Sequence, residues 1–596
     1  MENSSISAQE KKSVVNEKIQ RWLKGQIRDF TQNKRPKIVG FVFAFSAYLF
    51  YVISLVKLPE VFIFNFDNHQ PLMWRLFNSD VHLDDDVMIS MRVGLILNQT
   101  GIPSFNKTDL AQPSTSYFAP YLFSALARLL PSNLAILAFA AITFVGVTYL
   151  LVLLVLKSKS QILGMALILL VILTDTFKMY SLTGWDHNLQ SLFCCLAIWI
   201  ALREKLTLRS ASLVSLFLFL SVGFRPDSAI IAAGVFLGLG VRDRKSLQLF
   251  LAGGFFAVLI GILMYSNWKF FGSFTPTTSR LKLGGTFSFS DSASYIVKET
   301  SNFSILNIGI LSLVIYIVLF RFFPLFLIPI VVSCFFTMIY SVAVTDVFNG
   351  VRMSWTPTLV MILLILKYLP SPFGKQLIKI RCEIQSAFGQ FSMFNSAVSI
   401  IPIFIASFIL IAVPMVYQSY ERLAYNNSII RTENASPTSS QYALANWMEK
   451  NLEPTDGSIG LYWLGIGYHL PSFEIADFLG KADELIASQP VKWGPPGHNK
   501  WNTGATIRKW NPQVIFPSIS DLRDISVEES KKWIANRENF GFIADLRLNQ
   551  IVLNSYSYCT TTEGMPKKQS WNFFLRNDLM EKHSDAVNCV PVNWSS

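Results

Sequence analysis

The stretch LAILAFAAITFVGVTYLLVLLVL at residues 134–156 contains no charged side chain. A helix needs roughly 20 apolar residues to cross the hydrocarbon core of a bilayer, so this stretch is long enough to span a membrane. The whole chain has the same character, because its 596 residues are 51% hydrophobic and only 15% charged, with a mean hydropathy of +0.39. A soluble core of this length would need far less apolar surface. We therefore expect an integral membrane protein.

Further apolar runs resemble this stretch and bring the total to about eleven candidate membrane-spanning helices. One apolar region is interrupted by Arg225, Pro226 and Asp227, and could form two helices or one re-entrant hairpin. We expect two helices here. The eleven runs lie near residues 38–57, 134–156, 161–177, 189–202, 210–223, 227–241, 247–266, 305–320, 323–344, 357–369 and 397–417.

Basic residues predict the orientation, because Lys and Arg near the ends of spans stay on the cytoplasmic side. The arm at residues 1–37 is rich in both, and alternate short loops carry more. All of these lie on one side only if there are eleven spans, which places the N-terminus in the cytoplasm and everything after Tyr417 outside. The net charge of +12 is then mostly an orientation signal, with some contact to membrane lipid, and we do not infer nucleic-acid binding from it.

The predicted organisation has three parts. Residues 1–37 form a cytoplasmic basic arm, residues 38–417 a transmembrane domain with an outer loop at 58–133, and residues 418–596 a soluble domain outside the membrane. The last part alternates short apolar runs with helical stretches, which indicates an α/β domain. Its two cysteines, Cys559 and Cys589, could form a disulfide in an oxidising outer compartment.

Common catalytic motifs of soluble enzymes are missing from the sequence. The chain has no Walker A loop, no HExxH, no GxSxG and no GxGxxG, and no Cys/His spacing that fits zinc. Nucleotide hydrolysis, zinc proteolysis and serine-esterase chemistry therefore have no local support.

Three consecutive acids, Asp84, Asp85 and Asp86, lie in the predicted outer loop. Acids just outside a membrane span are either a solvated loop end or carboxylates that face a lipid-borne substrate. The residues that follow favour the second interpretation. Asp85, Asp86, Ile89, Ser90, Arg92, Gly101 and Asn106 resemble the string D-D-A-Y-I-S-x-R-x-x-x-N-L-x-x-G-x-G-x-x-x-N of the GT-C glycosyltransferases, typified by the terminal β-(1→2)-arabinofuranosyltransferases of mycobacterial cell-wall assembly.

Further strings follow in the order of that family. They are TGWDHNL at 183–189, FRPD at 224–227, FFGSFTPTTSRLKLGG at 270–285, DVFNGVRMSWTP at 346–357, WLGIGYHLPSFEIADFLGKADELIA at 463–487 and PGHNK at 496–500. The string at 463–487 resembles G-x-A-G-x-I-P-Y-Y-x-x-x-x-V-I-D-L-L-G-L-x-D. The chain departs from the pattern in the first string, where Val87 and Met88 replace Ala-Tyr and Ile96 replaces the Asn.

The resemblance implies a GT-C fold and a glycosyltransferase of the bacterial inner membrane that takes its sugar from a polyprenyl phosphate. We expect a pentofuranose, in the first instance arabinofuranose, transferred to a periplasmic glycan or to a surface protein such as a pilin. The fold class is therefore an α-helical polytopic membrane protein of the GT-C type with a C-terminal periplasmic α/β domain.

Displacement at an anomeric carbon needs a base for the acceptor hydroxyl and a cationic clamp for the departing phosphate. Asp85 or Asp86 is the candidate base, and Asp84 extends the pair so that the alignment is ambiguous by one residue. No cofactor is required, although a divalent cation, Mg²⁺ or Mn²⁺, could bind at these acids. Candidate contacts to the donor phosphate and sugar are Arg92, Asp186, Arg225, Lys269, Arg280, Lys282, Arg352 and His498.

Three other interpretations stay open. A GT-C enzyme could transfer a hexose or aminoarabinose to protein or lipid A and share the same topology. A transporter would carry its ionisable residues within the spans, near the membrane midplane. An assembly scaffold would tolerate loss of the Asp residues.

Overall fold

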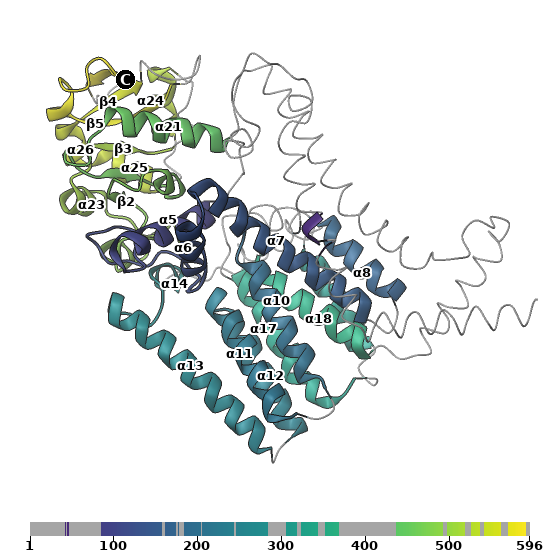
Figure 1. Cartoon of the computed structure of the whole chain (residues 1–596). Coiled ribbons are helices and arrows are strands. Elements are labelled where there is room, and N and C mark those ends of the chain that lie inside the picture. The colour runs from purple at the N-terminus through teal and green to yellow at the C-terminus, as the bar shows by residue number, and fades with distance from the viewer. Residues whose placement is uncertain are drawn as a thin grey trace, which may run out of the picture.

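The computed structural model of the chain combines a mostly helical part with a C-terminal part that contains a sheet (Figure 1). It describes residues 42, 44–46, 85–157, 161–174, 177, 184–203, 206–243, 246–283, 305–318, 323–343, 352–368, 437–492, 497–518, 526–536, 541–561 and 570–591.

Helices occupy the predicted apolar runs from 134–156 to 357–369. The run at 397–417 lies outside the described residues, and the run at 38–57 is described only at 42 and 44–46. These helices, here called the helical part, are α7 (Ser132–Lys157), α8 (Gln161–Leu173), α10 (His187–Ala201), α11 (Leu208–Phe224), α12 (Ser228–Arg242), α13 (Leu247–Phe271), α16 (Ile305–Val318), α17 (Ile328–Ala343, preceded by η2, Leu325–Leu327) and α18 (Trp355–Tyr368, preceded by η3, Arg352–Ser354).

The break at Arg225–Asp227 separates two helices, as predicted. A residue before proline is pushed out of the α region, and Arg225 is extended at φ −150° and ψ 117°. Helix α11 therefore ends at Phe224, and α12 begins at Ser228 after Pro226. The corner leaves Arg225 and Asp227 together at one end of the helical part.

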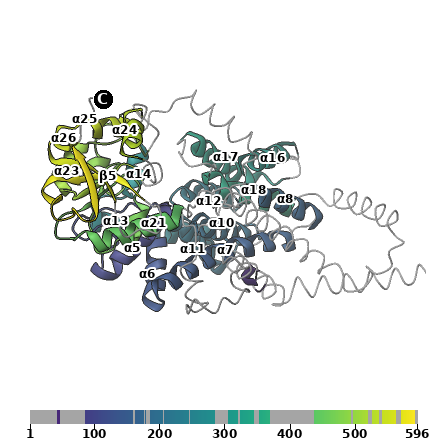
Figure 2. The same ribbon diagram turned by 90° about the horizontal axis from the view of Figure 1, so that it is seen from above.

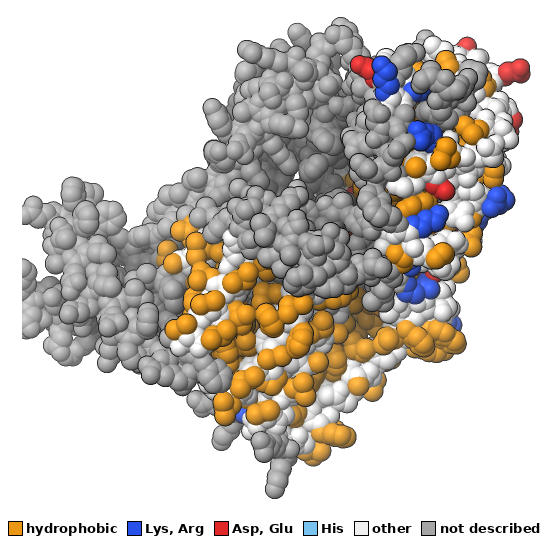
Figure 3. Space-filling view, turned by 180° about the vertical axis from the view of Figure 1, so that it is seen from behind, with side chains coloured by type: hydrophobic (Ala, Val, Ile, Leu, Met, Phe, Trp, Pro, Cys, Tyr) orange, Lys and Arg blue, Asp and Glu red, His pale blue; other side chains and the backbone are white. Residues whose placement is uncertain are grey.

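The outer surface of the helical part is apolar. Within the described residues, two helical segments are long and apolar enough to cross a membrane, Leu134–Leu156 and Leu247–Phe271, and several shorter apolar helices lie beside them. Helix α13 exposes large side chains such as Phe250, which is 77% exposed. Figure 3 shows hydrophobic side chains gathered over this part and charged ones over the other. Such a surface suits lipid, while the number of eleven spans stays a prediction.

The C-terminal part, residues 437–591, is here called the tail domain. Its six-stranded sheet has the order β2-β1-β3-β5-β4-β6, in which β1, β2 and β3 run parallel and the later strands pair antiparallel. The strands are β1 (Ile459–Leu461), β2 (Ile475–Asp477), β3 (Val514–Phe516), β4 (Tyr556–Thr561), β5 (Asn572–Arg576) and β6 (Val587–Pro591).

The helices of the tail domain are α21 (Pro437–Asn451), η5 (Gly465–His469), α22 (Glu484–Ala487), α23 (Thr503–Trp510), α24 (Val527–Asn536), α25 (Gly541–Leu548), α26 (Gln550–Ser555) and η6 (Asn577–Leu579). The predicted α/β class of this domain is therefore confirmed.

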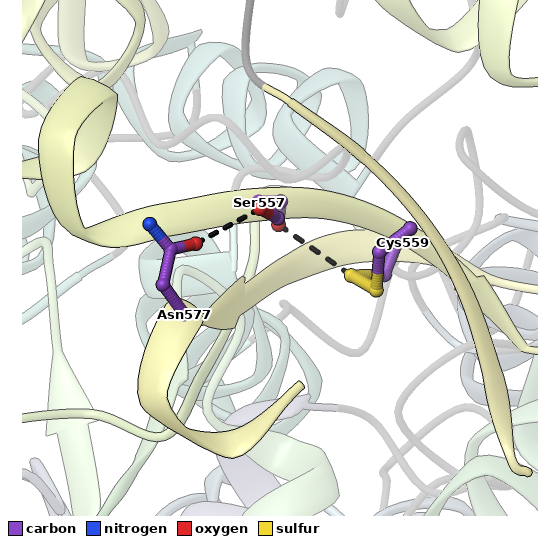
Figure 4. The surroundings of a disulfide bond; sticks show 4 residues. Ser557, Cys559 and Asn577 are labelled. Atoms are coloured by element: carbon purple, nitrogen blue, oxygen red, sulfur yellow. Dashed lines mark hydrogen bonds between the residues drawn. A yellow bond between two sulfur atoms is a disulfide. The ribbon is translucent and has the colours of Figure 1, made fainter. Parts of the chain in front are cut away.

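The predicted disulfide joins the sheet internally. Cys559 on β4 and Cys589 on β6 are opposite each other in the antiparallel ladder and form a disulfide bond. Figure 4 shows its surroundings, where the Ser557 hydroxyl also donates to Oδ1 of Asn577 at 2.8 Å. The bond ties the edge strand β6 to the rest of the sheet.

Helix α5 (Asp85–Thr100) connects the two parts, and Figures 1 and 2 show it with α6 (Ala119–Leu129) between them. Ile89 and Val93 belong to the apolar core of the tail domain, whereas Met88 and Met91 belong to that of the helical part. The Asn106 side chain pairs with both backbone groups of Ile475, at 2.9 Å each, along the edge of β2. The outer loop is thus built into the tail domain, and the boundary predicted at residue 418 lies outside the described residues.

Candidate active site

Two loops of the tail domain reach the start of α5. They follow the carboxyl ends of β1 and β2, the edge of a parallel sheet where ligand sites of α/β folds usually lie. Gly465 comes after β1 and Lys481 after β2, and both contact Asp85. The structure therefore brings together residues separated by almost 400 positions in the chain.

Asp85 is held by the tail domain on both carboxylate oxygens. Its Oδ1 accepts a hydrogen bond from the Gly465 backbone N–H at 2.5 Å, and its Oδ2 lies 3.5 Å from Nζ of Lys481. A Cβ atom at position 465 would lie 2.6 Å from Oδ1 of Asp85, so this close approach requires glycine. Burial raises the pKa of Asp85 above its usual value; the charge of Lys481 opposes that rise and the charge of Asp86 adds to it.

Asp86 faces cationic side chains from both parts of the protein. Its Oδ2 accepts a bond from Nη1 of Arg352 at 2.7 Å, and its Oδ1 lies 3.7 Å from Nζ of Lys481. The Arg352 guanidinium also lies over the Trp185 ring, 5.0 Å from its centroid, in a cation–π contact. We call Asp85, Asp86, Arg352 and Lys481 the acid–base cluster.

A second group of polar side chains lies where α10 begins and where α11 is followed by α12. Oδ1 of Asp186 is 3.2 Å from Nδ1 of His187 and 4.0 Å from Nη1 of Arg225. Nε of Arg225 lies 3.2 Å from Oδ1 of Asp227, and the Gln190 amide donates to Oδ2 of Asp227 at 2.8 Å. Because the Arg352 guanidinium lies over the ring of Trp185, the residue before Asp186, the acid–base cluster and this second group of side chains lie close to each other.

The predicted residues Asp85, Asp86, Asp186, Arg225 and Arg352 are thus brought together. Arg225 and Arg352 are each only 3% exposed. Both guanidinium groups are therefore buried and held in place by ion pairs, which suits recognition of an anion that must bind in one orientation.

Arg92 lies elsewhere and joins the two parts of the protein. It is 1% exposed, and its guanidinium donates to backbone carbonyls of the tail domain at Gly467, Leu470 and Phe473, as well as to Phe105 within its own loop. The N–H groups of the Arg92 guanidinium are bonded to these carbonyls, so its observed contacts hold the tail domain against α5. The predicted contact with the donor stays a prediction.

Replacing Arg92 with Met is expected to weaken docking of the tail domain, because several buried carbonyls would lose their donor. Each such group costs about 1–3 kcal/mol, so the apparent melting temperature should fall by several degrees. The measurement is thermal unfolding in detergent followed by tryptophan fluorescence. The exposed Arg508→Met serves as the control, and an equal melting temperature for both variants would contradict this structural role.

The remaining predicted residues take different positions. Lys269 is exposed near the end of α13, and Lys282 lies in α14 (Thr277–Leu283). Arg280 of α14 forms an ion pair with Glu484 of α22, which also accepts a bond from the Thr277 hydroxyl at 2.5 Å. Asp84 lies outside the described residues.

His498 is buried beside the loop that carries Gly465. Its ring centroid is 5.5 Å from that of Trp463, two residues before Gly465. The predicted donor or acceptor contacts of Lys269, Arg280, Lys282 and His498 stay predictions.

Sequence reasoning did not select Lys481. It lies in a string that was matched to the family, but no spacing relative to the Asp residues marks it, because the contact arises only when the tail domain folds onto α5. The three-dimensional fold is the only signal that identifies it.

The charges around the Asp residues bear on metal binding. Among the described residues, no group of three or more His, Cys, Asp or Glu side chains is arranged to hold a metal ion. Asp85 and Asp86 each face a cationic side chain, and a divalent cation between them would be repelled by Lys481 and Arg352. These residues therefore do not fit a metal site.

Asp477, at the end of β2, fixes the loop that carries Lys481. Its carboxylate accepts backbone bonds from Leu479 at 2.8 Å and from Ala482 at 2.5 Å. Burial raises its pKa to about 6 from a usual value of 3.8, against the effect of these bonds. The protonated carboxyl therefore stabilises the fold fully below pH 3.8, and this contribution is lost as the pH rises through about 6.

The Asp477→Asn variant is expected to lack this pH dependence. Apart from a constant offset for the changed hydrogen bond, the wild type should lose melting temperature relative to the variant between pH 4 and pH 7. Paired melting curves in detergent at both pH values measure the difference. A gap that does not change with pH would contradict the raised pKa.

Comparisons with known proteins do not identify the family of this chain. No protein-family model matches the chain, and no curated protein matches it. Among solved structures, it is similar to the archaeal oligosaccharyltransferase AglB from Archaeoglobus fulgidus, which was solved in complex with an inhibitory peptide and a dolichol-phosphate. The match has 13% sequence identity and a TM-score of 0.45, and covers 89% of this chain and 74% of that chain. A likeness at this level does not define the family or the activity of this chain.

Proposed function

We propose that this chain is a membrane glycosyltransferase of the GT-C type that transfers a pentofuranose, in the first instance arabinofuranose, from a polyprenyl phosphate to a periplasmic acceptor. The acceptor is a glycan or a surface protein such as a pilin. The chain resides in the bacterial inner membrane, with its N-terminus in the cytoplasm and the tail domain in the periplasm.

One observation carries this proposal. Asp86, from the string at 85–106, is ion-paired with Arg352, and Arg352 also lies over the ring of Trp185, next to the Asp186 that faces Arg225. These residues of separate strings lie between the apolar helical part and the tail domain. A lipid-linked donor keeps its phosphate at the level of the headgroups, where a site in this position can reach it. The acceptor can approach the same site from the aqueous side.

The contacts support separate roles for the two acids. Asp86 is bound by Arg352 in a short charge-assisted bond. Asp85 lies farther from its cationic partner, and burial raises its pKa above the usual value, which favours uptake of a proton. Asp85 is therefore our candidate base, and Asp86 holds Arg352 in position.

The reaction then proceeds by direct displacement. Asp85 accepts the proton of the acceptor hydroxyl, and the hydroxyl oxygen forms a bond to the anomeric carbon. The bond from that carbon to the phosphate oxygen breaks, and the polyprenyl phosphate departs with the electron pair. Arg352 and Arg225 stabilise the negative charge on the phosphate, and Asp186 is placed to bind sugar hydroxyls.

The other interpretations predict different behaviour. A GT-C enzyme for a hexose or aminoarabinose would use the same cluster with another donor. A transporter would need its ionisable groups along a path through the helical part, whereas the cluster lies at the junction with the tail domain. A scaffold would not depend on the acids at all.

The test is an in vitro transfer assay with purified protein in detergent and synthetic polyprenyl-phosphoryl arabinofuranose labelled in the sugar. We expect transfer with the wild type and its loss when Asp85 is replaced. Activity only with a polyprenyl-phosphoryl hexose or aminoarabinose would overturn the choice of sugar. No reaction with any lipid-linked sugar would overturn the proposed function.

A further inference from the structure

Lys481 is a buried cation that the tail domain places against α5. It is 7% exposed, and its Nζ lies 3.5 Å from Oδ2 of Asp85 and 3.7 Å from Oδ1 of Asp86. The family string that the sequence resembles, V-I-D-L-L-G-L-x-D, has leucine where this chain has Lys481. The motif therefore does not predict this contact.

The loop that carries Lys481 is built to hold one conformation. The Asp477 carboxylate binds the backbone N–H groups on either side of Lys481, at Leu479 and Ala482. Gly480 adopts a left-handed φ of +78°, and a Cβ atom there would lie 2.8 Å from the backbone nitrogen of Ala487. The position of the ammonium group is thus set by the loop as well as by the acids.

Asp85 depends on Lys481 more than Asp86 does. The groups that face Asp85 are Lys481, the Gly465 N–H and the neighbouring carboxylate of Asp86, whereas Asp86 has Arg352 as a second cation. Asp85 is 14% exposed, so water screens its charge poorly. Without Lys481, burial and the charge of Asp86 would both favour the protonated form of Asp85.

We propose that Lys481 is a positioning residue of the active site, supplied by the tail domain, which bridges the Asp85 and Asp86 carboxylates and keeps Asp85 ionised and oriented as the base. The role in catalysis rests on the proposed function. The bridge itself does not, because it concerns only contacts within the protein.

The first test is the pH dependence of kcat/KM for Lys481→Met and Lys481→Arg. We expect Lys481→Met to shift the acidic limb of the kcat/KM profile to higher pH by about one unit. At pH values below the limb kcat/KM then falls about tenfold, and at pH values well above the limb it changes little. Lys481→Arg keeps the positive charge, so its acidic limb should lie close in pH to that of the wild type. An equal loss of transfer by Lys481→Met at every pH would overturn the proposal.

Lys509 offers a matched control for this experiment. It also links the tail domain to the outer loop, since its Nζ lies 2.7 Å from Oδ2 of Asp109 and 3.0 Å from Oδ1 of Asp483, but it has no contact with the acid–base cluster within the described residues. Lys509→Met should leave the acidic limb in place. A shift as large as that of Lys481→Met would show a general effect of docking and overturn the proposal.

The second test is independent of activity. A double-mutant cycle of melting temperatures compares Lys481→Met in the wild type and in an Asp85→Asn background. We expect a clear loss of melting temperature in the first and a much smaller loss in the second, because the bridge is already broken. Equal losses would overturn the bridge. If the cycle shows coupling but the wild-type protein transfers no lipid-linked sugar, the proposed function is overturned, and with it the role of Lys481 in catalysis. The bridge between Lys481 and the two acids would still stand.

Discussion

Replacing Asp85 with Asn is expected to lower kcat for sugar transfer by roughly 10² to 10⁴-fold, the range that a positioned general base contributes. Asn keeps the size of the side chain, and its oxygen can still accept the bond from the Gly465 N–H. It cannot take a proton from the acceptor hydroxyl. Donor binding should change little, because the basic residues proposed to bind the phosphate, Arg225 and Arg352, are untouched.

The matched variant is Asp86→Asn, which removes the neighbouring charge and keeps the candidate base. Because Asp86 holds Arg352, this change should raise the KM for the lipid donor more than it lowers kcat. Steady-state kinetics of both variants, with melting curves to verify folding, separate the two acids. If Asp86→Asn abolished kcat while Asp85→Asn kept most of it, the base would be Asp86.

Replacing Arg352 with Gln is expected to lower kcat/KM by roughly 10² to 10³-fold, which is the usual cost of losing one preorganised donor to a developing anion. The guanidinium is buried between Asp86 and the Trp185 ring, so it needs little reorganisation when the phosphate departs. Arg352→Lys should recover only part of this loss, since an ammonium group keeps the charge but not the planar fork.

Arg242→Gln is the control for the Arg352 variant. Arg242 is also stacked on an aromatic ring, 5.3 Å from the centroid of Phe326, and is also ion-paired, with Asp243. It lies at the end of α12 away from Arg225, so its loss should change transfer at most a few-fold. Equal losses of kcat/KM in both variants would indicate that Arg352 acts through general stability.

Much of the fold follows from local pattern. Long apolar runs predict helices because a helix pairs its own backbone polar groups by hydrogen bonds, and this placed the helices of the helical part within a few residues. The short helix α14 lies in a predicted outer loop and was not predicted. Pro226 predicted the corner between α11 and α12 for an equally local reason. The sequence predicted eleven site residues, and the structure places five of them, Asp85, Asp86, Asp186, Arg225 and Arg352, near one another. Their roles stay predictions.

The roles of Arg92 and Lys481 could not be predicted in the same way. Both roles depend on which face of α5 the tail domain packs against. That face is determined by contacts between residues hundreds of positions apart. A buried arginine bound to carbonyls and one free to bind a phosphate look identical in sequence. Only the acceptors around Arg92 distinguish them.

The shared position of α5 has a consequence for biosynthesis. One face of this helix, with Ile89 and Val93, packs against Phe105 of its own loop and against residues of the tail domain such as Leu464 and Ile466. At 5–20 residues per second, the roughly 370 residues between Val93 and Leu464 take about 20–75 s to translate. During that interval no residues of the tail domain cover the apolar face, and the acid–base cluster has not yet formed. The nascent protein therefore gains its candidate active site only after the tail domain has been synthesised and has folded onto α5.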